Sequence, residues 1–131
     1  MPKTVVSRLV HDICDRVERR PDRINRNRRT WRLTDNGFEH GCVELDARKG
    51  YYGEVIVGLY VFDPRRLRPG DRLRDASQSM QYQLLEEGEQ KGSAGLVNVR
   101  YDDLVKVVAA TINMRLAESL YQPPSKREKG R

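Results

Sequence analysis

The chain has 131 residues, enough for one domain and too few for two domains that each bury a substantial core. Hydrophobic residues make up 37% and charged residues 34% of it, so we expect a small core with polar extensions. No apolar run reaches the roughly 18 residues of a membrane span, and the first residues mix charged with aliphatic side chains, unlike a secretion signal. The composition therefore predicts a cytoplasmic protein that does not associate with membranes.

Positive charge is concentrated in three short stretches. The formal net charge is +6, from 25 Lys and Arg against 19 Asp and Glu. Residues 16–32 carry eight arginines against two acidic residues, and further basic clusters occupy residues 65–74 and 123–131. Arginine offers a planar fork of donors that binds phosphate bidentately. This distribution is typical of a surface that binds a polyanion, with a solvated face that has no partner as the alternative.

The N-terminal segment has the spacing of an amphipathic helix. Apolar residues recur at i, i+3 and i+4 over residues 4–20, and Thr4 is suited to cap the first turn. Pro21 is expected to end this helix. Residues 22–29 follow without any periodicity and are rich in Asn and Arg, so we predict an exposed basic loop there.

The next segments have the pattern of strands. Residues 30–34 and 38–46 alternate polar and apolar side chains around an Asp-Asn-Gly turn, which predicts a hairpin. Residues 51–62 are apolar on both alternating faces, as in a central strand covered on both faces. Gly53 and Gly58 within it suggest bulges or close packing.

The second half of the chain alternates polar and structured segments. Residues 63–77 are rich in arginine and interrupt the sheet, either as a crossover or as a projecting two-stranded arm. Residues 80–86 are predicted as a strand, with a short helix as the alternative, and they would form a hairpin with residues 96–101. A last helix is expected over residues 103–120, with Asp102 as its N-cap.

These elements predict an α+β fold with an N-terminal helix, an antiparallel sheet of about five strands (a β-meander plus a hairpin) and a C-terminal helix. The domain would span residues 1–121, followed by a flexible basic tail over residues 122–131. The order of elements loosely resembles that of small dimeric secretion chaperones. That resemblance implies a binding or assembly role, although the basic charge of this chain departs from the acidic character of that group.

The chain's two histidines and two cysteines occur as His11-x-x-Cys14 and His40-x-Cys42. On a helix or a strand each pair can share one face, so a zinc site made by all four residues is an alternative. The spacings match no common zinc module, and we therefore expect ordinary histidines and reduced thiols.

No pattern of residues indicates catalysis. The sequence lacks a hydrolase nucleophile elbow, a phosphate-binding glycine loop and a metalloprotease motif. His40 and Cys42 would lie about 7 Å apart along one strand, too far for direct proton transfer. Acidic pairs at residues 86–87 and 102–103 fit a strand end and a helix start. We expect no enzymatic activity and no cofactor.

The basic stretches carry the leading functional hypothesis, a non-catalytic protein, of phage or viral type, that binds RNA or DNA through arginine-rich loops. Base stacking by Trp31, Tyr51 or Tyr52 is a secondary expectation. The predicted phosphate-binding residues are all arginines: Arg19, Arg20, Arg23, Arg26, Arg28, Arg29, Arg65, Arg66, Arg68, Arg72 and Arg74.

The alternative hypothesis is a small homo-oligomeric assembly, adaptor or chaperone-like protein whose basic loops bind an acidic protein partner. It predicts an interface on a sheet edge or helix face, where apolar residues would otherwise be exposed. Val107, off the main apolar stripe of the last helix, is one such residue. A homodimer or higher oligomer is expected under either hypothesis.

Overall fold

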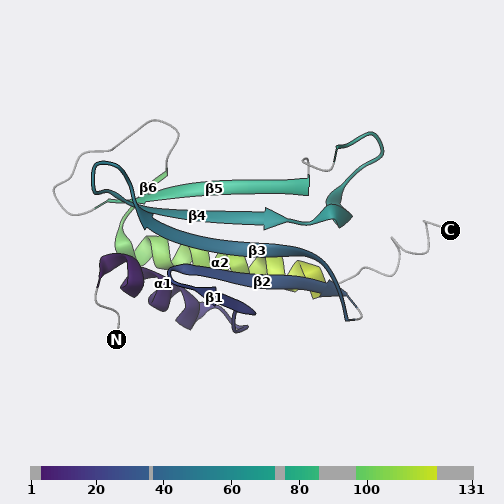
Figure 1. The fold of residues 1–131 in the computed structure, drawn as a ribbon, viewed down its shortest axis with the longest axis horizontal. Helices are drawn as coiled ribbons and strands as arrows, with labels where there is room; N and C mark the ends of the chain where they lie inside the picture. The colour runs from purple at the N-terminus through teal and green to yellow at the C-terminus, as the bar shows by residue number, and fades with distance from the viewer. Residues whose placement is uncertain (1–3, 36, 73–75, 86–96, 121–131) are drawn as a thin grey trace.

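Two helices cover one face of a six-stranded sheet in the computed structural model, which describes residues 4–35, 37–72, 76–85 and 97–120 (Figure 1). The strands lie in the sheet in chain order, from β1 at one edge to β6 at the other. The predicted α+β class is confirmed, and no described helix has the length and apolar character of a membrane span. The elements are α1 (Val5–Arg16), β1 (Arg23–Asn25), β2 (Arg28–Asp35), β3 (Phe38–Lys49), β4 (Val55–Phe62), the 3₁₀ turn η1 (Pro64–Arg66), β5 (Ser77–Leu84), β6 (Val97–Val99) and α2 (Tyr101–Leu120).

Helix α1 begins as predicted and ends earlier. The Thr4 hydroxyl accepts a hydrogen bond from the backbone N–H of Ser7 (3.0 Å), as an N-cap does. The helix ends at Arg16 and not at residue 20, because Asn113 of α2 caps it. The Asn113 amide donates to the Arg16 carbonyl (2.9 Å) and accepts from the N–H of Glu18 (2.8 Å). A cap supplied from so far along the chain leaves no local sequence signal.

The loop predicted over residues 22–29 is wrong. Strand β1 pairs antiparallel with β2, so that Asn25 lies opposite Arg28 and only Arg26 and Asn27 form the turn. Arg26 has a φ of +54°, a left-handed conformation that a two-residue hairpin turn requires and arginine seldom adopts. All three residues of β1 are exposed. Because no side chain of this edge strand is buried, its sequence shows no alternation of apolar and polar residues.

The hairpin predicted around residues 35–37 is confirmed, and it contains a β-bulge. Leu33 of β2 lies opposite Gly41, whereas Thr34 lies opposite Glu39, so His40 is the extra residue in β3. Strand β4 is central, between β3 and β5. Gly53 lies in the preceding turn, and the strand begins only at Val55.

The end of the sheet differs from the predicted hairpin. Residues 77–84 form a strand, and β6 then pairs parallel with β5, with Tyr82 opposite Val97. A parallel pair needs a connection of about a dozen residues, which the segment 85–96 provides. A hairpin prediction assumes the shortest return of the chain, and the sequence contains no signal against it.

The arginine-rich segment after β4 connects two antiparallel neighbours, so it is not a crossover. Its described part, residues 63–72, contains η1 and a turn in which the Asp71 N–H donates to the Arg68 carbonyl (3.0 Å). Gly70 in this turn has a φ of +90°. This part contains no strand, so it does not form the predicted arm.

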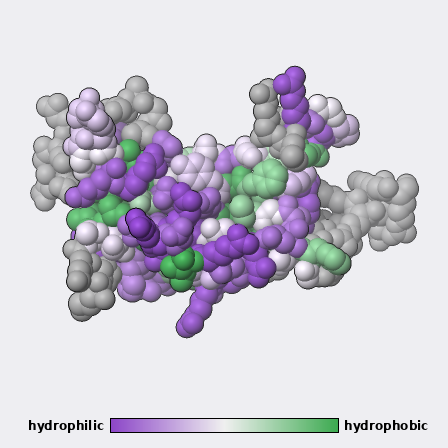
Figure 2. All heavy atoms as spheres, in the orientation of Figure 1, coloured by the Kyte–Doolittle hydropathy of each residue, from purple (hydrophilic) through white to green (hydrophobic). Residues whose placement is uncertain are grey.

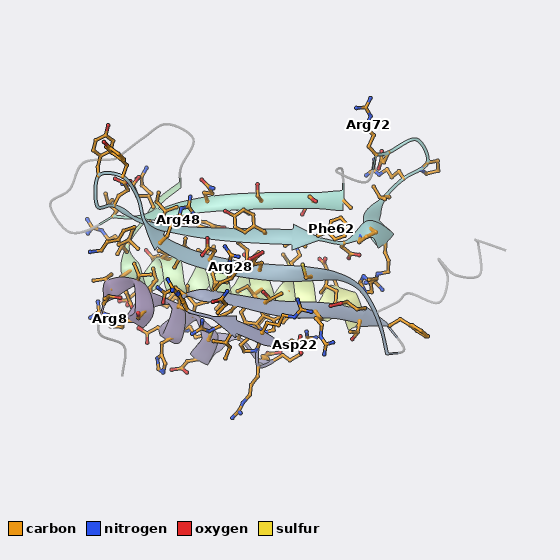
Figure 3. All side chains as sticks on the ribbon, viewed as in Figure 1. Arg8, Asp22, Arg28, Arg48, Phe62 and Arg72 are labelled. Atoms are coloured by element: carbon orange, nitrogen blue, oxygen red, sulfur yellow. The ribbon has the colours of Figure 1, made fainter. Side chains whose placement is uncertain are left out.

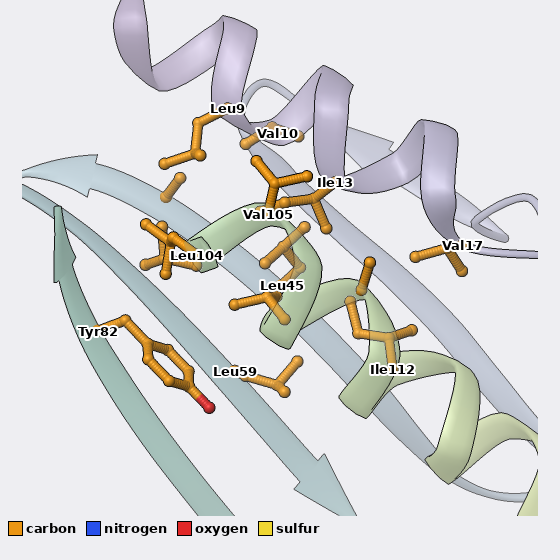
Figure 4. Packing of buried hydrophobic residues seen from close by; sticks show 14 of the residues in the cluster. Leu9, Val10, Ile13, Val17, Leu45, Leu59, Tyr82, Leu104, Val105 and Ile112 are labelled. Carbon is orange, nitrogen blue, oxygen red and sulfur yellow. The ribbon is translucent and has the colours of Figure 1, made fainter. Parts of the chain in front are cut away.

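The core lies between the helices and the sheet (Figure 4). Helix α2 begins two residues before the predicted start, with Asp102 and Asp103 in its first turn. Trp31 is fully buried and its indole N–H donates to the Arg19 carbonyl (2.8 Å), so the stacking role considered for it is wrong. The largest fully buried side chains are Trp31, Leu9, Ile13, Leu33, Leu45, Leu59, Leu104, Ile112, Val10, Val43, Val57 and Val108.

Candidate nucleic-acid interface

The second face of the sheet has no helix on it among the described residues, because α1 and α2 pack together on the other face. Among the described residues, helices therefore cover β4 on one face only, and not on both faces as its pattern predicts. Its apolar residues on this face are shielded by neighbouring side chains instead: Ile56 lies opposite Arg48 on one side and Gln83 on the other. Figure 2 shows a largely hydrophilic surface in this view, with smaller hydrophobic areas at the left, at the lower centre and right of the centre.

Strand register lines up this face in transverse rows, because residues directly opposite each other in a sheet share a face. Cations lie toward β1 and β2, aromatic residues on β4, and small or amide side chains on β5. The rows run Asn25, Arg28, Asp46, Gly58, Gln81; then Arg23, Thr30, Glu44, Tyr60, Ser79; then Arg32, Cys42, Phe62, Ser77.

Two of the arginines on this face are engaged by its carboxylates. The Arg28 Nε lies 2.9 Å from Glu44 Oε1, and an Arg48 nitrogen lies 3.8 Å from Asp46 Oδ2. Arg23 has no ion-pair partner among the residues that the structure describes. The uncovered face therefore keeps an excess of positive charge toward β1.

Arg32 lies beside an arrangement that completes the edge of β2. Its backbone N–H donates to the Asp22 carboxylate (2.6 Å), and its carbonyl accepts from the Arg19 guanidinium. Arg19 and Asp22 also form an ion pair at 3.0 Å, whereas the Arg32 guanidinium lies 3.9 Å from Asp22. Arg19 therefore stabilises the edge of β2 by this hydrogen bond, while the guanidinium of Arg32 lies beside the uncovered face.

Two adjoining hollows occur on this face, and Phe62 and Cys42 line both. The first, of about 370 Å³, has Arg23, Arg32 and Glu39 among its walls, so two cations and one carboxylate face it. The second, of about 410 Å³, is lined by the Tyr60 ring and by Ser77 and Ser79. Figure 3 shows Phe62 near the end of β4. The Phe62 ring is half-buried and lies between a cationic hollow and a hydrogen-bonding one.

A buried corner closes one end of the first hollow. The Nδ1 of His40 lies 3.3 Å from Oδ1 of Asp63, but neither ring nitrogen makes an aligned hydrogen bond. Asp63 accepts from the backbone N–H of Arg65 (3.2 Å). A Cβ at Gly41 would overlap the carbonyl oxygen of Phe62, so only glycine allows β3 to approach the end of β4 this closely.

The four residues considered for zinc are not brought together. Cys14 packs against the core on the helix-covered face, whereas His40 and Cys42 line the uncovered face. Burial raises the pKa of both thiols, and Glu44 and Glu39 raise that of Cys42 further. Cys42 is therefore a weak nucleophile at neutral pH. Among the described residues, His11, Asp12 and Asp15 lie close together on the surface of α1. Exposed acidic groups of this kind are common without a metal ion.

The predicted arginines separate into two groups. Arg23 and Arg28 lie on the uncovered face, and Arg26 is exposed at the hairpin turn beside them. Arg29 points to the other side of β2, and its guanidinium donates to the carbonyls of Arg26 and Arg28. Arg20 is exposed between α1 and β1.

The second predicted cluster lies on the loop that follows β4. Arg65 approaches Asp63 (3.4 Å), while Arg68 and Arg72 are exposed. Arg72 projects away from the sheet in Figure 3. The Arg66 side chain and all of Arg74 lie outside the described part of the chain, as does the tail predicted over residues 122–131.

Several residues of this face were missed as candidate site residues, namely Arg32, Arg48, Tyr60 and Phe62. The alternation of β2 and β3 would place Arg32 and Arg48 opposite the core residues. Tyr60 and Phe62 gave no such signal, because β4 is apolar on both of its faces and the sequence does not distinguish the two.

Searches against protein-family models, curated proteins and solved structures each give no match to this chain.

Proposed function

We propose that this protein binds nucleic acid without catalysis, through the uncovered face of its sheet. The observation that supports this function is the placement of Arg23, Arg28 and Arg32 on the edge strand β1 and its neighbour β2, on a face that no described helix covers. Arginines in such an array can each contact a different phosphate of one backbone. The polar residues of β5 lie within the same face and offer hydrogen bonds to sugar or base.

Further charges on and beside this face also support binding of a polyanion. The ion pair with Glu44 orients the Arg28 guanidinium, which reduces the entropy lost when a phosphate is bound, and Arg48 lies 3.8 Å from Asp46. Arg23 adds a positive charge without an ion-pair partner among the described residues. The exposed Arg68 on the loop after β4 extends the positive surface beyond the sheet.

Fluorescence anisotropy with labelled RNA and DNA tests this proposal at salt concentrations from about 50 to 300 mM. Combined Arg23→Ala and Arg32→Ala should weaken binding at least tenfold and lower the salt slope by about two phosphate contacts. The matched control is Arg16→Ala with Lys106→Ala, the same charge change on the helix side. Equal losses in the two variants would place the interface elsewhere, and no binding at the lowest salt would refute the function.

Assembly on an acidic protein partner is a second candidate. One observation favours it: Tyr51 and Tyr52, at the turn before β4, are 93% and 88% exposed and pack edge to face with ring centroids 5.0 Å apart. Val107 is also exposed, as expected. This candidate predicts a homodimer or higher oligomer that Tyr51→Ser with Tyr52→Ser converts to a monomer. Light scattering coupled to size exclusion measures this change, and an unchanged mass would contradict it.

A further inference from the structure

We propose that the ligand of the uncovered face is single-stranded nucleic acid, with an unpaired base stacked on Phe62 and the adjoining phosphate bound by Arg23 and Arg32. This inference rests on the proposed function and adds the class of nucleic acid and the position of one nucleotide. It applies to RNA and DNA alike, because both present the same phosphodiester group and aromatic bases.

The two hollows supply the halves of a nucleotide site. The hollow toward β1 is lined by Arg23, Arg32 and Thr30, and also by Glu39, so its cations outnumber its carboxylate and suit a phosphate. The hollow toward β5 has the Tyr60 ring as an apolar wall and the hydroxyls of Ser77 and Ser79 as hydrogen-bonding groups. Such a mixed lining suits the ring and edge of a base.

Phe62 is placed to connect the two hollows. It lies directly opposite Cys42 on β3 and Ser77 on β5, so its side chain shares the uncovered face with both. Its neighbour along this face, Tyr60, is held by a long hydrogen bond from the Gln81 amide (3.5 Å). Two aromatic residues in alternate positions of one central strand, with the arginines on the strands beyond β3, form a stacking platform for successive bases.

A paired duplex does not fit this arrangement. Its bases are stacked on one another and present only their edges to a protein, so neither ring of β4 can stack on a base face. The rings lie within the sheet surface and do not project as wedges that could enter a duplex, since both are half-buried. An unpaired strand is therefore the ligand that uses the arginines and the rings together.

The test compares the chain's two phenylalanines. Phe62→Leu keeps an apolar side chain and removes the ring, and we expect its affinity for a labelled single strand of uridines or thymidines to fall about tenfold. Phe38→Leu makes the same chemical change at the start of β3, outside both hollows, and should leave affinity unchanged. Phe62→Trp should retain binding, because its indole ring can stack on a base in the same way, and loss of binding in a folded tryptophan variant would contradict the inference. If the leucine variant does not fold by circular dichroism, the comparison with an abasic oligomer is the test.

The second arm separates stacking from charge. An abasic oligomer of equal length carries the same phosphates without bases, and we expect the wild-type chain to bind it about tenfold more weakly than the base-containing strand. A duplex should also bind more weakly. If the abasic oligomer and the duplex bind as tightly as the single strand, the stacking inference is overturned while the proposed function stands. If no nucleic acid binds, both proposals fail.

Discussion

Along β3, Val43, Leu45 and Ala47 point to the two helices, while Cys42, Glu44 and Asp46 alternate with them and point to the uncovered face. The first set is buried and in contact with residues of both helices, which packing alone explains. The second set places carboxylates beside arginines and next to aromatic rings. This difference between faces of one strand separates residues that hold the fold together from residues available to a ligand.

Substitutions on β3 should show the largest contrast. Leu45→Ala removes a fully buried side chain and leaves a cavity, so we expect the free energy of unfolding to fall by about 2–5 kcal/mol. Glu44→Ala, one residue earlier, loses only a partly exposed ion pair with Arg28 and should cost at most about 1 kcal/mol. Urea unfolding of the two variants measures this, and equal costs would show that the uncovered face is also structural.

Gly41→Ala tests the corner where the two faces meet. Because the new Cβ would overlap the Phe62 carbonyl, β3 and the end of β4 must separate, which should cost about 1–3 kcal/mol. Thermal unfolding measures the loss, and amide chemical shifts of Phe62 and Asp63 report the displacement. Unchanged shifts in a stable variant would mean that β3 and the end of β4 had not separated, which would contradict the expected overlap.

Much of the helix-covered face was predictable from the sequence. The apolar periodicity of α1 and α2 and the alternation of β2 and β3 identify core positions even when the neighbouring elements are not known. The residues of the uncovered face were harder to predict. Its composition depends on which strands are neighbours, and the parallel pairing of β6 has no local signal. Charge counting found Arg23 and Arg28, but it also selected Arg29, whose guanidinium stabilises its own turn. Only the register shows that Phe62 lies between arginines and serines.

Two substitutions of Arg26 should show a smaller effect on stability, and their comparison separates backbone conformation from charge at the hairpin turn. Arg26→Gly removes the steric cost of the left-handed backbone, because glycine adopts this conformation readily. Glycine also gives the unfolded chain more entropy, so the net gain in stability should be about 0.5 kcal/mol. Arg26→Val introduces a β-branched residue at the same φ and should lower stability by about 1 kcal/mol. Both variants lose the same charge, so the difference between their melting temperatures isolates the backbone. Identical temperatures would contradict this explanation.

The smallest expected effect lies on the helix side, at the contact between α1 and α2. The Tyr101 hydroxyl donates to the Asp12 carboxylate, which lowers the pKa of Asp12 below 3.8. The ionised form therefore stabilises the fold above pH 3.8, and this contribution is lost as the pH falls through the lower pKa of the folded state. After solvent screening, Asp12→Asn should cost about 0.3 kcal/mol at neutral pH.

Chemical unfolding across this pH range measures the Asp12 effect. The difference between wild type and Asp12→Asn should close as the pH falls below 3.8. A difference that stays constant with pH would assign the cost to the shape of the amide and not to ionisation.

The arrangement of Arg19 and Asp22 at the edge of β2 also affects how the protein behaves at high concentration. Beyond β1, an exposed strand edge would offer free N–H and carbonyl groups to a strand of another chain. At Arg32 both groups are already bonded, one to a carboxylate and the other to a guanidinium. Two charged side chains thus occupy the positions that a pairing strand would need, and this part of the sheet is protected against aggregation.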